Sequence, residues 1–178
     1  MRITVSGLPG SGTTSLARYL AEILQTDLIS AGEVFRQMAR EHGMELAEFG
    51  RLAESDPSFD RLIDDRQKDI ALAHENIIVE GRLSGWFVPQ ADLKIWLYAT
   101  PECRVTRIQT RDTIEDLEAA AQMTRERESC EAVRYKTYYE IDIADISPYH
   151  IVLNSERFSV EELGSIVCSA IGVIRQRT

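Results

Sequence analysis

The sequence predicts an α/β fold with a five-stranded, mainly parallel sheet covered by helices on both faces. Short apolar runs typical of buried strands alternate with segments whose apolar residues recur at helical spacing. Such an alternation produces βαβ units, and these units pair their strands in parallel. A glycine-rich loop also joins the first apolar run to the first helical pattern. At 178 residues the chain is the size of one domain, spanning residues 1–178.

The glycine-rich loop, residues 7–14 with the sequence GLPGSGTT, follows a first strand at residues 3–5. Its glycines allow backbone conformations that other residues avoid, so the backbone N–H groups and the start of the next helix together bind an anion. The loop matches the nucleotide-binding pattern G-x-x-x-x-G-K-[ST] except at Thr13, which replaces the lysine. We expect Thr14 to coordinate Mg²⁺ through its hydroxyl. The predicted nucleotide-binding residues are Gly7, Leu8, Pro9, Gly10, Ser11, Gly12, Thr13, Thr14 and Ser15.

A second ligand site is predicted after the next strand, residues 27–29, which ends at Ser30. The apolar residues that follow recur at helical spacing, and Arg36 lies on another face of that helix. A strand end that opens a helix bearing an arginine is where α/β sheets place ligands. The alternative is that Arg36 is an ordinary solvated arginine.

Residues 45–74 are helical in pattern and highly charged, and they are interrupted at Asp56 and Pro57. The pattern predicts a helical hairpin that stands off the sheet. It could serve as a mobile lid over a second substrate or be an ordinary solvated helix pair.

The clearest central strand is residues 76–79, which is followed by Glu80, Gly81 and Arg82. An acidic residue just beyond a buried strand is where a P-loop protein holds Mg²⁺ or its water, so we expect Glu80 to be a metal residue. A structural ion pair between Glu80 and Arg82 is the alternative.

The next strand, residues 93–98, leads to a helix that Thr100 caps and Pro101 begins. This helix bears a basic stripe of Arg104, Arg107 and Arg111, and the helical segment 114–139 bears a second group: Arg125, Arg127 and Arg134. Such a stripe is usually a solvated face. Here the two groups could supply the positive charge that the loop lacks without its lysine.

The last strand, residues 151–153, precedes a helix that opens with a capping box from Ser159 to Glu162 and has a full apolar face. The net charge of −9 argues against a nucleic-acid partner, which would need clustered cationic surface. No apolar run approaches the ~20 residues of a membrane span. The first strand leaves no room for a signal peptide, and the three cysteines are spaced for neither disulfides nor zinc. We expect a cytoplasmic monomer.

Four stretches of the sequence together resemble the nucleoside monophosphate kinases, and among them the archaeal type of cytidylate kinase. They are residues 7–14, 30–36, 80–82 and 127–134. The last is the most specific, because it matches the pattern R-[DE]-x-x-[DE]-x-x-R of a helix that contacts the pyrimidine nucleotide. The resemblance implies a P-loop NTPase fold with a small helical nucleotide-binding lobe at residues 32–74 and a lid at residues 104–135.

The implied reaction transfers phosphate from ATP to CMP or dCMP with Mg²⁺ as cofactor. Phosphoryl transfer needs alignment and positive charge more than a side-chain base, which fits an arginine-rich site. The catalytic residues implied by the resemblance are Arg107, Arg111, Arg127 and Arg134. The CMP-binding residues it implies are Ser30, Arg36, Arg82, Arg127, Glu131 and Arg134, and the metal residues are Thr14 and Glu80.

Two other functions remain open from the sequence. One is a kinase for another nucleoside monophosphate or a small metabolite, which would share the sequence features up to Arg82. The other is a catalytically silent nucleotide-binding protein, for which Thr13 would mark the loss of catalysis. The retained set of arginines argues against the silent protein, since a protein that only binds nucleotide would not need it.

Overall fold

The computed structural model describes residues 1–44, 49, 52 and 58–176. Five strands form one sheet in the order β2-β3-β1-β4-β5, and all four pairings are parallel. The strands are β1 (Arg2–Gly7), β2 (Asp27–Ser30), β3 (Ile77–Glu80), β4 (Leu93–Tyr98) and β5 (Ile151–Asn154). The predicted α/β fold with a parallel sheet is therefore confirmed, and each predicted strand is present.

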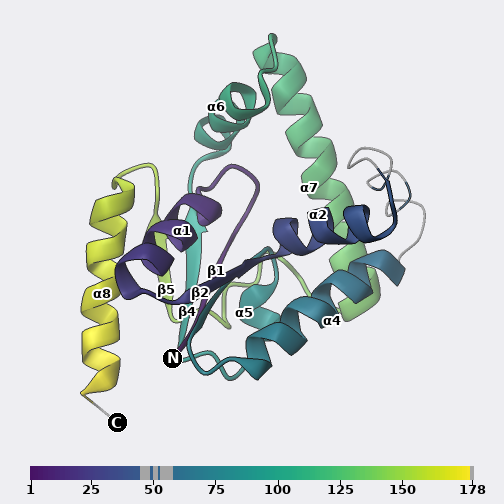
Figure 1. The fold of residues 1–178 in the computed structure, drawn as a ribbon. Helices are drawn as coiled ribbons and strands as arrows, with labels where there is room; N and C mark the ends of the chain where they lie inside the picture. Colours follow the sequence, from purple (N-terminus) through teal and green to yellow (C-terminus); the bar gives the residue numbers. More distant parts are fainter. Residues whose placement is uncertain (45–48, 50–51, 53–57, 177–178) are drawn as a thin grey trace.

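Helices connect the strands and cover both faces of the sheet (Figure 1). They are α1 (Thr13–Leu24), α2 (Ala31–Glu41), α4 (Ser58–Ala73), α5 (Ser84–Phe87), α6 (Pro101–Asp112), α7 (Leu117–Tyr139) and α8 (Val160–Arg175). The short helix α5 is absent from the sequence prediction. In the predicted hairpin at residues 45–74, α4 is confirmed as a helix, and the break at Asp56 and Pro57 lies outside the described residues.

Two apolar clusters form on opposite faces of the sheet because successive strand residues point to opposite sides. Ile78 packs in one cluster with α1 and α8, whereas its neighbours Ile77 and Val79 pack in the other with α2 and α4. Both faces of the central strands are thereby covered, which explains their uninterrupted apolar runs. A third, smaller cluster joins α5 to the end of α7.

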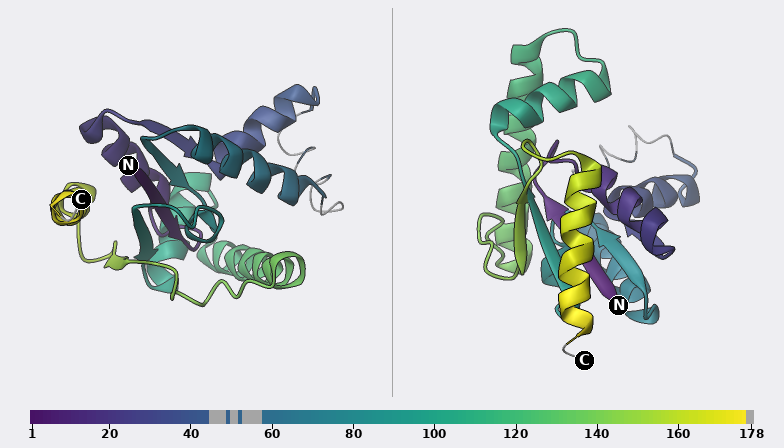
Figure 2. Two further views of the ribbon diagram at one scale, coloured as in Figure 1. Left: turned by 90° about the horizontal axis from the view of Figure 1, so that it is seen from below. Right: turned by 90° about the vertical axis from the view of Figure 1, so that its left-hand side faces the viewer.

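The long helix α7 and its partner α6 form a hairpin that rises beyond the carboxyl ends of the strands (Figures 1 and 2). Asp116 caps α7 by accepting hydrogen bonds from the backbone N–H groups of Glu118 and Ala119 at 3.3 and 3.1 Å. No helix in the described ranges combines the length and apolarity that crossing a membrane requires. The glycine-rich loop at residues 7–14, called the phosphate loop below, thus lies with α2 and the α6–α7 hairpin around the carboxyl ends of the strands, where parallel sheets place ligands.

Candidate active site

The loop that follows β1 has its carbonyl oxygens engaged by donors from other parts of the chain. Four side chains provide the hydrogen bonds: Arg82 to Gly7 O at 3.2 Å, Arg104 to Pro9 O at 3.1 Å, Arg107 to Gly10 O at 3.4 Å and Ser155 to Ser11 O at 2.7 Å. Backbone N–H groups within the loop and helix α1 take up the carbonyls of Leu8 and Gly12, each at 3.1 Å. With the carbonyl oxygens taken, the N–H groups are the polar backbone groups that the loop can offer to a ligand, which fits an anion.

Two glycines of this loop cannot be replaced without moving the backbone. Gly10 has a φ of +80°, and a Cβ there would lie 2.5 Å from the carbonyl oxygen of Arg104. A Cβ on Gly7 would lie 2.7 Å from the carbonyl oxygen of Leu97. The loop is therefore packed directly against β4 and α6, and its glycines are required by contact as well as by conformation.

The side chain of Thr13, at the position of the usual lysine, points into the protein. Its hydroxyl donates a hydrogen bond of 2.7 Å to Oε1 of Glu80, and both residues are buried. The parallel register aligns Val5 with Glu80, which sets the end of β3 beside the start of the loop. Thr14, by contrast, is exposed at the first turn of α1.

Glu80 is a buried carboxylate with no positive partner in the described part of the chain. The ion pair with Arg82 that the sequence left open does not form, because Arg82 turns to Glu131. Buried charges in proteins are paired or bind metals. That Glu80 and Thr14 hold Mg²⁺ stays a prediction, and the absence of an ion pair at Glu80 among the described residues is compatible with it.

A second buried carboxylate, Glu131 on α7, lies between two arginines. Arg82 donates from Nε at 3.1 Å and Arg127 donates from Nε at 2.8 Å. Burial raises the pKa of the Glu131 carboxyl, but the charges and hydrogen bonds of the two arginines outweigh burial and bring the pKa below its ordinary value. Since Arg82 also bonds the carbonyl of Gly7, one side chain connects the phosphate loop to α7.

The basic stripe on α6 is not a uniformly solvated face. Arg104 is 4% exposed and also pairs with Glu128 of α7, so it fastens both the loop and α7. Arg107 bonds the loop and both the hydroxyl and the carbonyl of Ser155, at 3.0 and 2.7 Å. Only Arg111 is fully at the surface, where its hydrogen bond lowers the pKa of the Asp112 carboxyl below its usual range.

The remaining predicted residues lie on α2 and α7. Ser30 is buried and caps α2, with its oxygen accepting from the N–H of Glu33 at 3.0 Å. Arg36 is exposed, and its ion pair among the described residues is a 3.7 Å contact to Glu33. Arg134 is partly buried on α7, one turn beyond the residues that meet Arg82.

Sequence reasoning missed two residues that hold the site together. Gln67 of α4 is 2% exposed, and its amide donates to the carbonyl of Glu80 at 2.7 Å. Ser155 fastens the loop to the end of β5. The only sequence signal for Gln67 is a polar residue four positions before the buried Ala71, on the apolar face of a helix.

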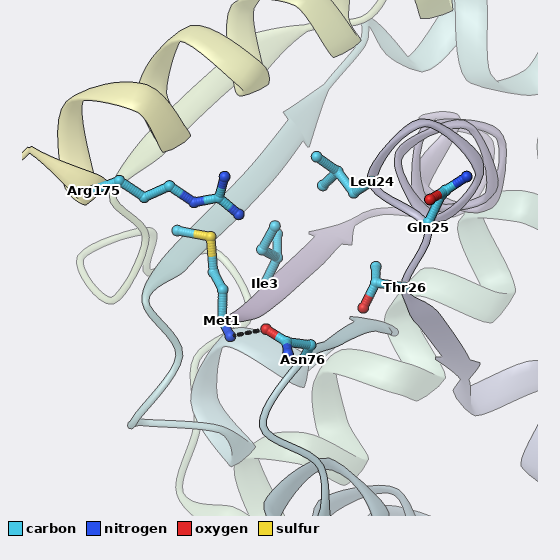
Figure 3. Close-up of a pocket in the computed structure, with 7 residues that line it drawn as sticks. All are labelled: Met1, Ile3, Leu24, Gln25, Thr26, Asn76 and Arg175. Atoms are coloured by element: carbon cyan, nitrogen blue, oxygen red, sulfur yellow. Dashed lines mark hydrogen bonds between the residues drawn. The ribbon is translucent and has the colours of Figure 1, made fainter.

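A hollow of about 250 Å³ lies at the opposite end of the strands, where β1 begins (Figure 3). Met1, Ile3, Leu24, Gln25, Thr26, Asn76 and Arg175 line it. The N-terminal ammonium donates to Asn76 there at 2.5 Å. This hollow contains none of the predicted site residues and takes no part in the site at the carboxyl ends of the strands.

A family model described as the cytidylate kinase-like family matches residues 2–157. The chain belongs to the cytidylate kinase-like family. It is 62% identical over 176 residues to a cytidylate kinase of Methanospirillum hungatei, covering 99% of both chains. It is 64% identical to a cytidylate kinase of Methanoregula boonei, covering 99% of this chain and 97% of that one. A cytidylate kinase of Archaeoglobus fulgidus is 49% identical, over 97% of this chain and 96% of that one.

Solved structures support the fold of this cytidylate kinase-like chain at a lower level of identity. The shikimate kinase of Acinetobacter baumannii matches with a TM-score of 0.65 and 19% identity, covering 96% of this chain and 92% of that chain. The shikimate kinase of Aquifex aeolicus matches with a TM-score of 0.59 and 17% identity, covering 97% of each chain. At these identities the likeness concerns the fold alone.

Proposed function

We propose that this chain transfers the γ-phosphoryl group of ATP to CMP or dCMP in the cytoplasm, forming ADP and CDP or dCDP. The observation that carries the proposal is the double contact of Arg82, which bonds both Gly7 of the phosphate loop and Glu131 of α7. This contact joins a nucleotide-phosphate cradle to the helix that matches the pyrimidine-nucleotide pattern. The cytidylate kinases to which the chain is 49–64% identical support the same activity.

The acceptor nucleotide is held by the side chains around α2 and α7. Arginines grip phosphate through paired, charge-assisted hydrogen bonds, which suits Arg36, Arg82, Arg127 and Arg134 to the phosphate of CMP. Ser30 and Glu131 provide polar groups for the rest of the nucleotide. Because Arg36 is exposed, breaking its 3.7 Å contact with Glu33 to bind a ligand costs little free energy.

The donor side is formed by residues 7–15, with Arg107 and Arg111 as cationic groups on α6. Glu80 and Thr14 would hold Mg²⁺, which when bound neutralises charge on the phosphates. Arg107 is already bonded to the loop, whereas Arg111 sits on the projecting hairpin and can approach the transferring group when the hairpin closes. Closure also excludes water, so that phosphate passes to CMP and is not lost to hydrolysis.

The direct test is ADP formation by the purified protein with Mg²⁺-ATP and each nucleoside monophosphate in turn, compared with ATP alone. A site that hydrogen-bonds its substrate rejects analogues that leave its polar groups unpaired, so CMP and dCMP should be far better acceptors than AMP or GMP. UMP should be the nearest competitor. Equal turnover of AMP and CMP would refute the cytidylate assignment, and ATP binding without transfer to any acceptor would favour the silent protein.

A further inference from the structure

The carboxylate of Glu80 forms no ion pair with the described residues. It is 7% exposed, and of its two oxygens only Oε1 accepts a hydrogen bond from the described residues, from the hydroxyl of Thr13. The main chain of the same residue is held separately, by Gln67. A neutral donor orients the carboxylate without forming an ion pair with it, so its second oxygen remains available to a cation.

We propose that Thr13 is a positioning residue for Glu80, and that threonine replaces the usual lysine because a neutral donor is needed there. The inference rests on the proposed function for its reference to Mg²⁺-ATP. Thr13 is 6% exposed and its side chain is committed to Glu80, so it does not follow the γ-phosphate as a P-loop lysine does. Its contribution to the reaction is made through Glu80.

A lysine at this position would meet a carboxylate that has no other cation beside it among the residues that the structure describes. The ammonium would pair with Glu80, and this pairing would withdraw both charges from the bound nucleotide. Positive charge at the phosphates comes instead from arginines on α6 and α7. In this proposal the arginines take over the charge that the lysine supplies elsewhere, so the absence of the lysine does not mark lost catalysis.

The test is the affinity for ATP, measured by calorimetry without CMP, in Mg²⁺ and again in EDTA. The metal ratio is the dissociation constant for ATP in EDTA divided by that in Mg²⁺. It reports how strongly metal and protein cooperate in binding ATP, and it requires no turnover and no acceptor. Thr13→Val keeps the shape of the side chain and removes the hydroxyl, so the ratio should fall about tenfold, the loss expected for one hydrogen bond to a charged group. Thr13→Ser keeps the hydroxyl and should stay within about twofold of wild type on the same grounds. Glu80→Gln should lower the ratio at least as far as Thr13→Val.

The double variant Thr13→Val with Glu80→Gln decides whether Thr13 acts through Glu80. If it does, the double variant has the same metal ratio as Glu80→Gln alone. If the two residues act independently, the losses of the two single variants add. An unchanged ratio in Thr13→Val, equal losses in the serine and valine variants, or additive losses in the double variant would each overturn the proposal.

The lysine variant tests the charge argument with the same measurement. In Thr13→Lys the metal ratio should fall as in Thr13→Val, while the affinity for ATP in EDTA stays near that of wild type. Tighter binding of metal-free ATP with an unchanged metal ratio would show that the lysine reaches the phosphates, against the proposal. Because CMP is absent throughout, a wrong acceptor assignment would appear only in the turnover assay and leave these results standing.

Discussion

Two buried carboxylates are connected to the phosphate loop, Glu80 through Thr13 and Glu131 through Arg82, and their surroundings differ. Glu131 on α7 is 6% exposed and bonds two arginines, whereas Glu80 at the end of β3 is 7% exposed and bonds one neutral hydroxyl. A buried charge without a partner is costly, so a protein retains one where a ligand supplies the opposite charge. The difference is consistent with the roles proposed above, in which Glu131 supports the acceptor site and Glu80 binds the metal.

The largest effect is expected when the unpaired carboxylate is neutralised. Glu80→Gln keeps an acceptor for Thr13 but removes the charge offered to Mg²⁺, so kcat should fall on the order of 100-fold, as for loss of one electrostatic contact in a transition state. The free energy of unfolding should stay within about 0.5 kcal/mol of wild type or rise, because an uncompensated buried charge is gone. Steady-state kinetics and urea denaturation measure the two quantities. A clear loss of stability would show that Glu80 has a positively charged partner in the folded protein.

The acceptor side is tested separately by a change that leaves both carboxylates in place. Arg36→Ala should weaken the use of CMP by about 1.5–3 kcal/mol while leaving ATP binding nearly unchanged, since it removes a charge-assisted grip on phosphate. Kinetics at varied CMP and at varied ATP separate the two effects.

Arg40→Ala is the matched control, because Arg40 is exposed one turn further along the same helix. It should leave both substrates within about twofold of wild type, as expected for a surface change that touches no ligand. An unaltered KM and kcat for CMP in Arg36→Ala would remove Arg36 from the site.

Glu131→Gln should reverse the pattern expected for Glu80→Gln by lowering stability. It leaves Arg82 and Arg127 without their shared anion, at a cost of about 1–3 kcal/mol, because Arg127 is half exposed and water screens part of the loss. Glu118→Gln is the control, since the pair between Glu118 and Arg125 is exposed and should contribute at most ~0.5 kcal/mol. Urea denaturation of both variants gives the comparison, and equal losses would mean that burial of Glu131 contributes nothing.

The strands and the glycine-rich loop of this protein could be predicted from the sequence because each has a local signal. The five apolar runs became strands because each is short, apolar and bounded by polar or glycine residues, and the loop at residues 7–14 carries its own conformational signal. The four-residue helix α5 is too short to show a periodicity. Sequence spacing put Arg104 on a stripe with Arg107, but only the fold decides that Arg104 faces the loop and is buried.

The contacts that distinguish the two carboxylates could not be predicted, because they depend on tertiary packing. Thr13 and Glu80 are 67 positions apart, and their hydrogen bond depends on the register between β1 and β3. Arg82 and Glu131 meet across 49 positions because α7 folds back along the sheet. The resemblance predicts which residues form the site, and the structure adds which of the described ones are already paired.

The smallest effect expected is a pH dependence that belongs to Glu131. Its pKa in the folded protein lies below the ordinary value of 4.5, because the two arginines outweigh burial. The carboxylate therefore contributes stability above that ordinary value, and the contribution is lost as the pH falls through the lowered folded pKa. The difference in unfolding free energy between wild type and Glu131→Gln should be constant from pH 7 to about pH 5.5 and narrow below about pH 4.5. Urea denaturation of both proteins across this range measures the difference, and other titrating groups cancel because the two proteins share them. An equal difference in unfolding free energy at pH 4 and pH 7 would mean that the arginines do not hold Glu131 as an anion. The different surroundings of Glu131 and Glu80 would then need another explanation.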